Sequence, residues 1–141
     1  MTDGIEANKD VVRRFVAAWN ERDPGGFDEV MAEGAVLHIG GSDIACDPVA
    51  TKAIVDQWTT AFPDWRFELL ALVAEGDKVV AHLPYSGTFR EPILGIDATG
   101  RSANVDEIVI FKIAAGKIVE AWEVYDECGM WRQLGVQPHP D

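Results

Sequence analysis

Two glutamates near the end of the chain, Glu107 and Glu123, are the residues best placed for chemistry. They lie in the apolar segments 105–113 and 117–125, which predict two adjacent strands joined by a tight hairpin. Because side chains alternate along a strand, the two glutamates would face each other across the pair. Two carboxyls in one apolar site raise the pKa of one of them, and a carboxyl that titrates near neutral pH can remove a proton and return it. The alternative for each is a solvated acid on an exposed strand face.

The faces of these two strands define the neighbours of the glutamates. Glu107 shares its face with Val109, two residues later. On the second strand the face of Glu123 also carries Val119, Ala121 and Tyr125. Asp126 follows this strand directly and is the rival acid. It would either act on a substrate or cap the turn that follows.

The three histidines are dispersed and give a weaker signal. His38 lies between Leu37 and Ile39, where it would donate to a ligand carbonyl or shuttle a proton at the mouth of a pocket, or else be a satisfied core residue. His82 lies within an alternating strand, and His139 lies in the tail. Without an HxxxH spacing they do not predict a zinc site, and we expect no metal.

Helices are predicted in the first half of the chain. Apolar residues recur at three- and four-residue steps from Asn8 to Trp19, and a short second helix with Phe27, Val30 and Met31 on one face should end at Gly34. A third helix should start at Asp47–Pro48 and stop at Phe62, before Pro63. We expect the ends, residues 1–9 and 137–141, to be frayed.

Strands are predicted for most of the remainder, and a loop is predicted from Arg90 to Arg101. The predicted strands are 35–39, 65–74, 78–88, 105–113 and 117–125. Helices followed by a run of strands indicate the α+β class rather than alternating α/β. The 141 residues, without a repeat or linker, predict a single domain over 1–141. Strongly twisted strands wrapped around three helices would form a cone with an interior pocket.

Composition excludes several classes of partner. The net charge of −12 argues against nucleic acid and against anionic membrane surfaces, which both require clustered Lys and Arg. The sequence predicts no segment that spans a bilayer, and we expect no targeting leader. Cys46 and Cys128 have no metal-ligand spacing and predict free thiols in a cytoplasmic protein.

Several motifs together resemble the SnoaL-like polyketide cyclases. They are RFVAAWNERD, AVLHIGG and FPDW in the first half, and GDKVV, SGTF, GIDATGR, VDEIVIFKIAAGKIVEAWEVYDE and WRQLG in the second. The resemblance implies the α+β cone shared with ketosteroid isomerase and nuclear transport factor two. It also implies a homodimer paired through the outer sheet face, and ring closure by intramolecular aldol condensation without a metal or nucleotide cofactor.

The resemblance also implies a set of site residues. Glu123 aligns with the catalytic aspartate of the cyclases and is one methylene longer, and Val109 occupies the position of their histidine. Glu107 would compensate for that histidine. From the aromatic residues of the sequence itself, we also expect that Tyr85 and Tyr125 donate hydrogen bonds to an enolate. The side chains expected to contact a flat hydrophobic ligand are Trp19, Trp58, Phe62, Tyr85, Val109, Phe111 and Tyr125.

Three functions remain open from the sequence. The first is an acid/base enzyme that cyclises or isomerises a hydrophobic carbonyl compound, with Glu123 or Asp126 as its acid/base. The second is a dimeric binding protein without catalytic activity, which the valine at position 109 favours. The third is an epoxide hydrolase built on Arg101 and Asp106, which requires Arg101 to lie inside the pocket.

Overall fold

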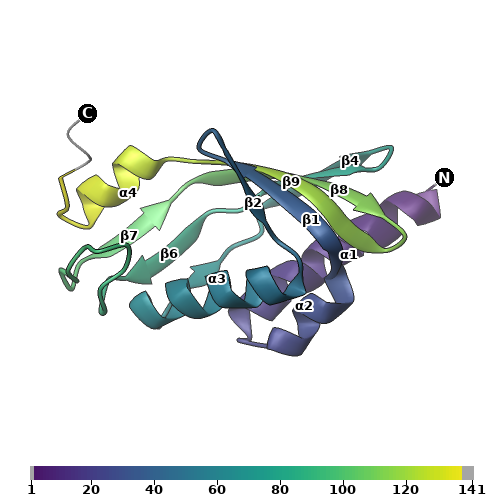
Figure 1. Cartoon of the computed structure of the whole chain (residues 1–141). Coiled ribbons are helices and arrows are strands. Elements are labelled where there is room, and N and C mark those ends of the chain that lie inside the picture. Colours follow the sequence, from purple (N-terminus) through teal and green to yellow (C-terminus); the bar gives the residue numbers. More distant parts are fainter. Residues whose placement is uncertain (1, 138–141) are drawn as a thin grey trace.

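Helices and a long curved sheet form two layers in the computed structural model, which describes residues 2–137 (Figure 1). Three helices lie together on one side of the sheet, and a fourth lies near the C-terminus, against a smaller sheet. The helices are α1 (Thr2–Asn20), α2 (Pro24–Val30), α3 (Pro48–Ala61) and α4 (Glu127–Gln133). The predicted α+β class is confirmed, with four helices in place of three.

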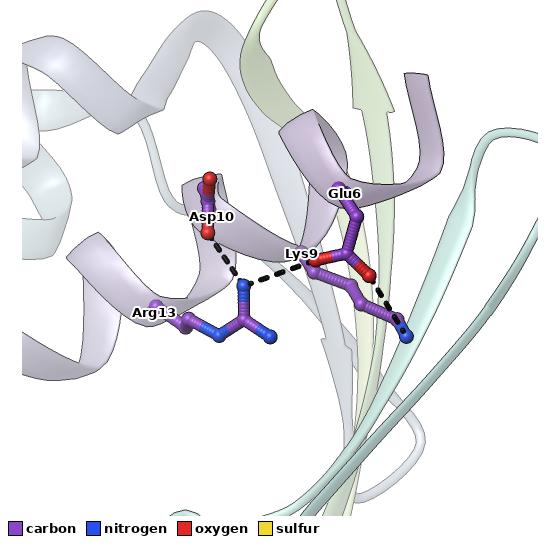
Figure 2. Close-up of polar contacts among 4 residues, drawn as sticks. All are labelled: Glu6, Lys9, Asp10 and Arg13. Atoms are coloured by element: carbon purple, nitrogen blue, oxygen red, sulfur yellow. Dashed lines mark hydrogen bonds and ion pairs between the residues drawn. The ribbon is translucent and has the colours of Figure 1, made fainter. Parts of the chain in front are cut away.

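The first helix differs from the prediction at its start. α1 begins at Thr2, so residues 2–9, which were expected to be frayed, are helical. Ion pairs on its solvent-facing side join Lys9 and Arg13 to Glu6, and Arg13 to Asp10 (Figure 2). Exposed pairs of this kind stabilise a helix only slightly, because water screens the charges. Of the C-terminal segment expected to be frayed, residues 138–141, including His139, lie outside the described residues.

The long sheet has six strands in the order β2–β1–β9–β8–β5–β4. β1 runs parallel to β9, and the other neighbours in this sheet are antiparallel. Its strands are β1 (Met31–Ile39), β2 (Ser42–Ala45), β4 (Ala71–Glu75), β5 (Lys78–His82), β8 (Glu107–Ala114) and β9 (Lys117–Tyr125). A second, antiparallel sheet contains β3 (Arg66–Phe67), β6 (Tyr85–Thr88) and β7 (Ser102–Val105).

Two predicted strands are each divided between the two sheets. The segment 65–74 becomes β3 and β4, and the segment 78–88 becomes β5 and β6, with Leu83 and Pro84 at the second break. Proline has no backbone N–H to donate to a strand ladder. The break keeps its other hydrogen bonds, because the Leu83 N–H donates to the Glu107 carbonyl and the Pro84 carbonyl accepts from Glu68. The chain therefore leaves the long sheet at this point and enters the smaller one.

Two bulges also change the predicted pattern. Gly34, expected to end α2, lies within β1 at φ 76°, where the register with β9 shifts between Met31 and Val36. A second shift places both Ile113 and Ile118 on the inside of the β8–β9 pair. Val119, predicted to share the face of Glu123, is therefore displaced from it, and Ile118 joins that face instead.

The core fills the space between α1, α2 and the concave face of the sheet. Its fully buried side chains include Val12, Phe27, Val30 and Ile118. Phe15 of α1 lies edge-on to Phe111 of β8, with ring centroids 5.4 Å apart. Each such side chain, fully buried, stabilises the fold by about 1.5–3 kcal/mol. This packing holds β8 and β9 in place beneath the helices.

Candidate active site

A cavity of about 300 Å³ lies between the helices and the concave face of the sheet. Its wall comes from α1, α3, β1, β2, β3, β6, β8 and β9. Most of the lining side chains are apolar or aromatic, as expected for a small-molecule site. The volume is at the low end of the range for such sites, so it fits a small ligand.

Glu107 and Glu123 both line this cavity, on adjacent strands. In the β8–β9 ladder Glu107 lies across from Tyr125, and Glu123 lies across from Val109, so the two carboxyls are diagonal neighbours on one face. A hydrogen bond joins the two side chains. Glu107 is only 4% exposed, while Glu123 is partly exposed and turns toward the cavity. The structure thus brings together the two acids that the sequence singles out.

Burial is the main cause of the raised pKa of both carboxyls. It raises the pKa of Glu107 well above its usual range, and the charge of Glu123 and their shared hydrogen bond raise it further. Burial also raises the pKa of Glu123, while its hydrogen bond with Glu107 offsets part of that rise. Glu107 is therefore the carboxyl that keeps its proton, and Glu123 is the one that ionises first. Two interacting carboxyls in an apolar site titrate as a pair and hold a proton to higher pH than a solvated carboxyl does.

Two tyrosines stand beside the carboxyls. The Tyr85 hydroxyl donates to the Met130 thioether sulfur at 3.2 Å, and the Tyr125 hydroxyl donates to Glu127 Oε2 at 3.2 Å. Burial raises the pKa of both phenols, so both remain protonated donors. Both rings line the cavity.

The other lining aromatics form a stacked wall. The Trp65 ring stacks on Tyr85 at 4.3 Å and on Trp19 at 5.5 Å, and Trp58 is tilted against Trp65. The indole N–H groups of Trp19 and Trp65 are buried without a hydrogen-bond partner in the described structure. Of the predicted ligand-contacting set, the cavity is lined by Trp19, Trp58, Tyr85, Val109, Phe111 and Tyr125.

Phe62 is the member of that set that does not line the cavity. It follows the last residue of α3 and turns toward the small sheet, where it stacks on Phe89 at 5.2 Å and closely approaches Gly87. Trp65 lines the cavity in place of Phe62. The expected ligand-contacting set omits Trp65, although the alternation of the predicted strand 65–74 places it on the same face as Phe67, which also lines the cavity.

His38 lies on the opposite face of β1 from the cavity. Its neighbours Leu37 and Ile39 line the cavity, but its own ring stacks on Trp122 outside. Nδ1 lies 2.6 Å from Asp43 and Nε2 lies 2.6 Å from Glu120, and these hydrogen bonds raise the pKa of His38. The expectation that His38 stands at the pocket mouth is wrong. His82 makes a similar outward contact of 2.6 Å with Asp106.

Asp126 also lies away from the cavity lining. Its carboxylate accepts from the Gly129 N–H at 2.9 Å and caps α4, which is the second of the two roles that the sequence allows. Arg101 is exposed and covers Gly135, so it does not enter the cavity. Its position removes the arrangement that an epoxide hydrolase requires.

Cys46 lines the cavity as a free thiol, and burial raises its pKa to about 11. It is therefore protonated at neutral pH and is a poor nucleophile. Within residues 2–137 no group of three or more His, Cys, Asp and Glu side chains could hold a metal ion. In the same part of the chain, none of the helices combines the length and the apolar character that crossing a bilayer would require.

The fold and the sequence together assign the chain to a family. Residues 9–134 match the family model described as SnoaL-like polyketide cyclase, and the chain belongs to this family. No curated protein matches the sequence significantly.

Three solved structures illustrate the likeness. TsrD from Streptomyces laurentii is 33% identical with a TM-score of 0.83, over 92% of this chain and 96% of that one. IdmH from Streptomyces antibioticus, provisionally described as a polyketide cyclase, is 25% identical with a TM-score of 0.78, over 92% and 99%. AclR from Streptomyces galilaeus, provisionally described as a hydroxylase, is 23% identical with a TM-score of 0.82, over 95% and 99%, and shares the fold.

Proposed function

We propose that this protein is an acid/base enzyme that cyclises or isomerises a hydrophobic carbonyl compound, with Glu123 as the base. The observation that carries the proposal is the hydrogen-bonded carboxyl pair of Glu107 and Glu123 inside an apolar cavity. A carboxylate held in such surroundings is a stronger base than one in water, because burial disfavours its charged form. Membership of the cyclase family supports the same class of reaction.

The proposed reaction needs only proton transfers and one new bond. The Glu123 carboxylate removes a proton from a carbon beside a carbonyl, and the C–H electron pair moves into an enolate. In a ring closure the enolate carbon attacks a second carbonyl of the same molecule, and the new alkoxide takes the proton from the carboxyl. In an isomerisation the carboxyl returns the proton to another carbon. Both sequences leave Glu123 ionised, with Glu107 still donating its hydrogen bond.

The experiment that tests this function is hydrogen–deuterium exchange of 1-tetralone in D₂O, followed by NMR at C2. Glu123→Gln should lower the protein-catalysed exchange at least about 100-fold, the usual contribution of a positioned base. Glu75→Gln, on an exposed residue of β4, is the matched control and should leave the rate unchanged. Exchange in wild type no faster than in buffer alone would instead support the second function, binding without catalysis, which Val109 favours.

We also propose that two copies pair through the outer face of the long sheet. Val73, Ile108 and Val124 are 66%, 49% and 73% exposed, and Ile108 lies across from Val124 in the β8–β9 ladder. An exposed apolar surface across neighbouring strands is typical of an interface between subunits. Ile108→Glu should convert the dimer to a monomer in light scattering after gel filtration, and Leu94→Glu, on an exposed loop, should not. A monomeric wild-type protein would exclude this pairing.

A further inference from the structure

The cavity offers few hydroxyl groups that could turn toward a ligand. The Thr51 hydroxyl donates to the Cys46 carbonyl at 2.8 Å, and the Tyr125 hydroxyl donates to a Glu127 carboxylate oxygen at 3.2 Å. Both acceptors are oxygens. The Tyr85 hydroxyl differs, because its partner at 3.2 Å is the sulfur of Met130.

A thioether is a weak hydrogen-bond acceptor, and a carbonyl or enolate oxygen is a much better one. A ligand oxygen that reached Tyr85 would therefore replace the Met130 sulfur at little cost. The donor is also buried, where a hydrogen bond to a charged oxygen is stronger than it is in water.

The Tyr85 ring is held in a fixed position close to the carboxyl pair. It stacks on Trp65 with centroids 4.3 Å apart and rings 15° from parallel, and Phe67 stands edge-on to it at 5.9 Å. The Tyr125 ring is tilted against it with centroids 6.4 Å apart, and Tyr125 lies across from Glu107 in the β8–β9 ladder. A donor fixed in this way needs no rearrangement when charge develops on a ligand.

The cavity lining also lacks a cation to balance an enolate. Among the described residues that line it, none is Lys, Arg or His. Neutral donors must therefore stabilise a negative oxygen there.

We propose that the Tyr85 hydroxyl leaves the Met130 sulfur and donates to the carbonyl oxygen of the ligand, whose charge it stabilises as the enolate forms. The proposal deepens the function proposed above by assigning a second residue that touches the substrate. It also identifies the ligand as one with a hydrogen-bond acceptor oxygen beside the carbon that loses its proton. Because the bond strengthens as the oxygen becomes negative, its effect is expected on the rate of proton removal more than on binding of the ketone.

Binding of 1-naphthol and of naphthalene, measured by fluorescence, tests this contact directly. The oxygen of 1-naphthol corresponds to the enol oxygen of 1-tetralone, and naphthalene lacks it. We expect Tyr85→Phe to weaken 1-naphthol binding about tenfold, the effect of one hydrogen bond, and to leave naphthalene binding unchanged. Met130→Leu, which removes the competing sulfur, should leave 1-naphthol binding as tight as in wild type or tighter.

An equal loss for 1-naphthol and naphthalene in Tyr85→Phe would overturn the proposal, because it would show that the phenol only shapes the cavity. Unchanged binding of both would overturn it as well. In the 1-tetralone exchange Tyr85→Phe should lower the rate about 100-fold, in the range for loss of one donor to an oxyanion. Loss of exchange in Glu123→Gln without loss in Tyr85→Phe would reject this inference and leave the proposed function standing. If wild type catalyses no exchange, the proposed function fails, and the naphthol comparison still decides whether Tyr85 binds a ligand oxygen.

Discussion

Val109 lies directly across from Glu123 in the β8–β9 ladder, and both side chains line the cavity. Val109 is 4% exposed, so the space beside the carboxyl of Glu123 is occupied by methyl groups. The resemblance to the cyclases implies a histidine at this place. In this chain the hydrogen-bond partner of Glu123 is instead Glu107, which lies two residues before Val109 on the same face of β8. The titratable pair that lines the cavity is therefore made of two carboxyls.

Val109→His tests whether the replacement of a histidine partner by Glu107 sets the pH dependence of the reaction. An imidazolium beside Glu123 would favour its carboxylate and lower its pKa, so the pH profile of 1-tetralone exchange should shift toward acid. Val109→Asn places a polar group there without a charge and should not produce this shift. An unchanged profile in Val109→His would show that position 109 does not reach the carboxyl.

Glu107→Gln should change the dependence of stability on pH. The folded-state pKa of Glu107 is raised, so the folded protein binds a proton that the unfolded chain releases above the ordinary pKa of 4.5. Wild-type stability should fall as pH rises from that value through the raised pKa. Glu107→Gln keeps a neutral hydrogen-bonding group and should remove this part of the fall. Thermal unfolding of both proteins between pH 4 and 9 measures it, and parallel curves would contradict it.

His38→Asn should act in a different pH range. Hydrogen bonds to Glu120 and Asp43 raise the pKa of His38, so its stabilising effect is fully present below its ordinary pKa of 6.5 and is lost as pH rises through the raised value. The difference in melting temperature between wild type and variant should shrink across that range. Because the ring faces away from the cavity, 1-tetralone exchange should not change. A loss of 1-tetralone exchange would show that the cluster of His38, Asp43 and Glu120 influences the cavity.

Arg22→Lys should destabilise the fold. The Arg22 guanidinium donates to three backbone carbonyls, those of Trp19, Pro63 and Trp65, and so ties the end of α1 to the segment that carries the aromatic wall. A lysine has no planar fork and cannot reproduce these bonds. We expect a loss of about 1–3 kcal/mol in urea unfolding. Arg14→Lys, on the exposed side of α1, is the control and should have no measurable effect.

The carboxyl pair could be predicted because it depends on local chain geometry. A short hairpin fixes how β8 and β9 pair, and alternation then places Glu107 and Glu123 on one face. The same argument fails for His38. Which face of β1 turns inward is set by the bulge at Gly34 and by parallel pairing with a strand far along the chain, and neither has a sequence signal at that distance.

The sequence does not predict β7 and α4, because their local patterns are weak. β7 is short and contains Ser102 and Asn104, and it forms because β6 pairs with it and the Gln133 side chain bonds both the N–H and the carbonyl of Asn104. α4 contains Gly129, a poor helix former, which is needed because the capping carboxylate of Asp126 occupies the space where a Cβ would lie. In both cases contacts between distant segments outweigh local propensity.

The contiguity of β8 and β9 has a consequence for how such proteins diversify. The two carboxyls belong to a single hairpin, whereas another part of the cavity lining comes from α3 and from Ile44 of the exposed strand β2, which are distant in sequence. Substitutions in α3 or β2 can change the shape offered to a ligand while the hairpin keeps its register and its shared proton. Under the proposed function, the reactive group and the ligand selectivity would therefore lie on separate segments, so that new substrates could be acquired while the hairpin that carries the two carboxyls is kept.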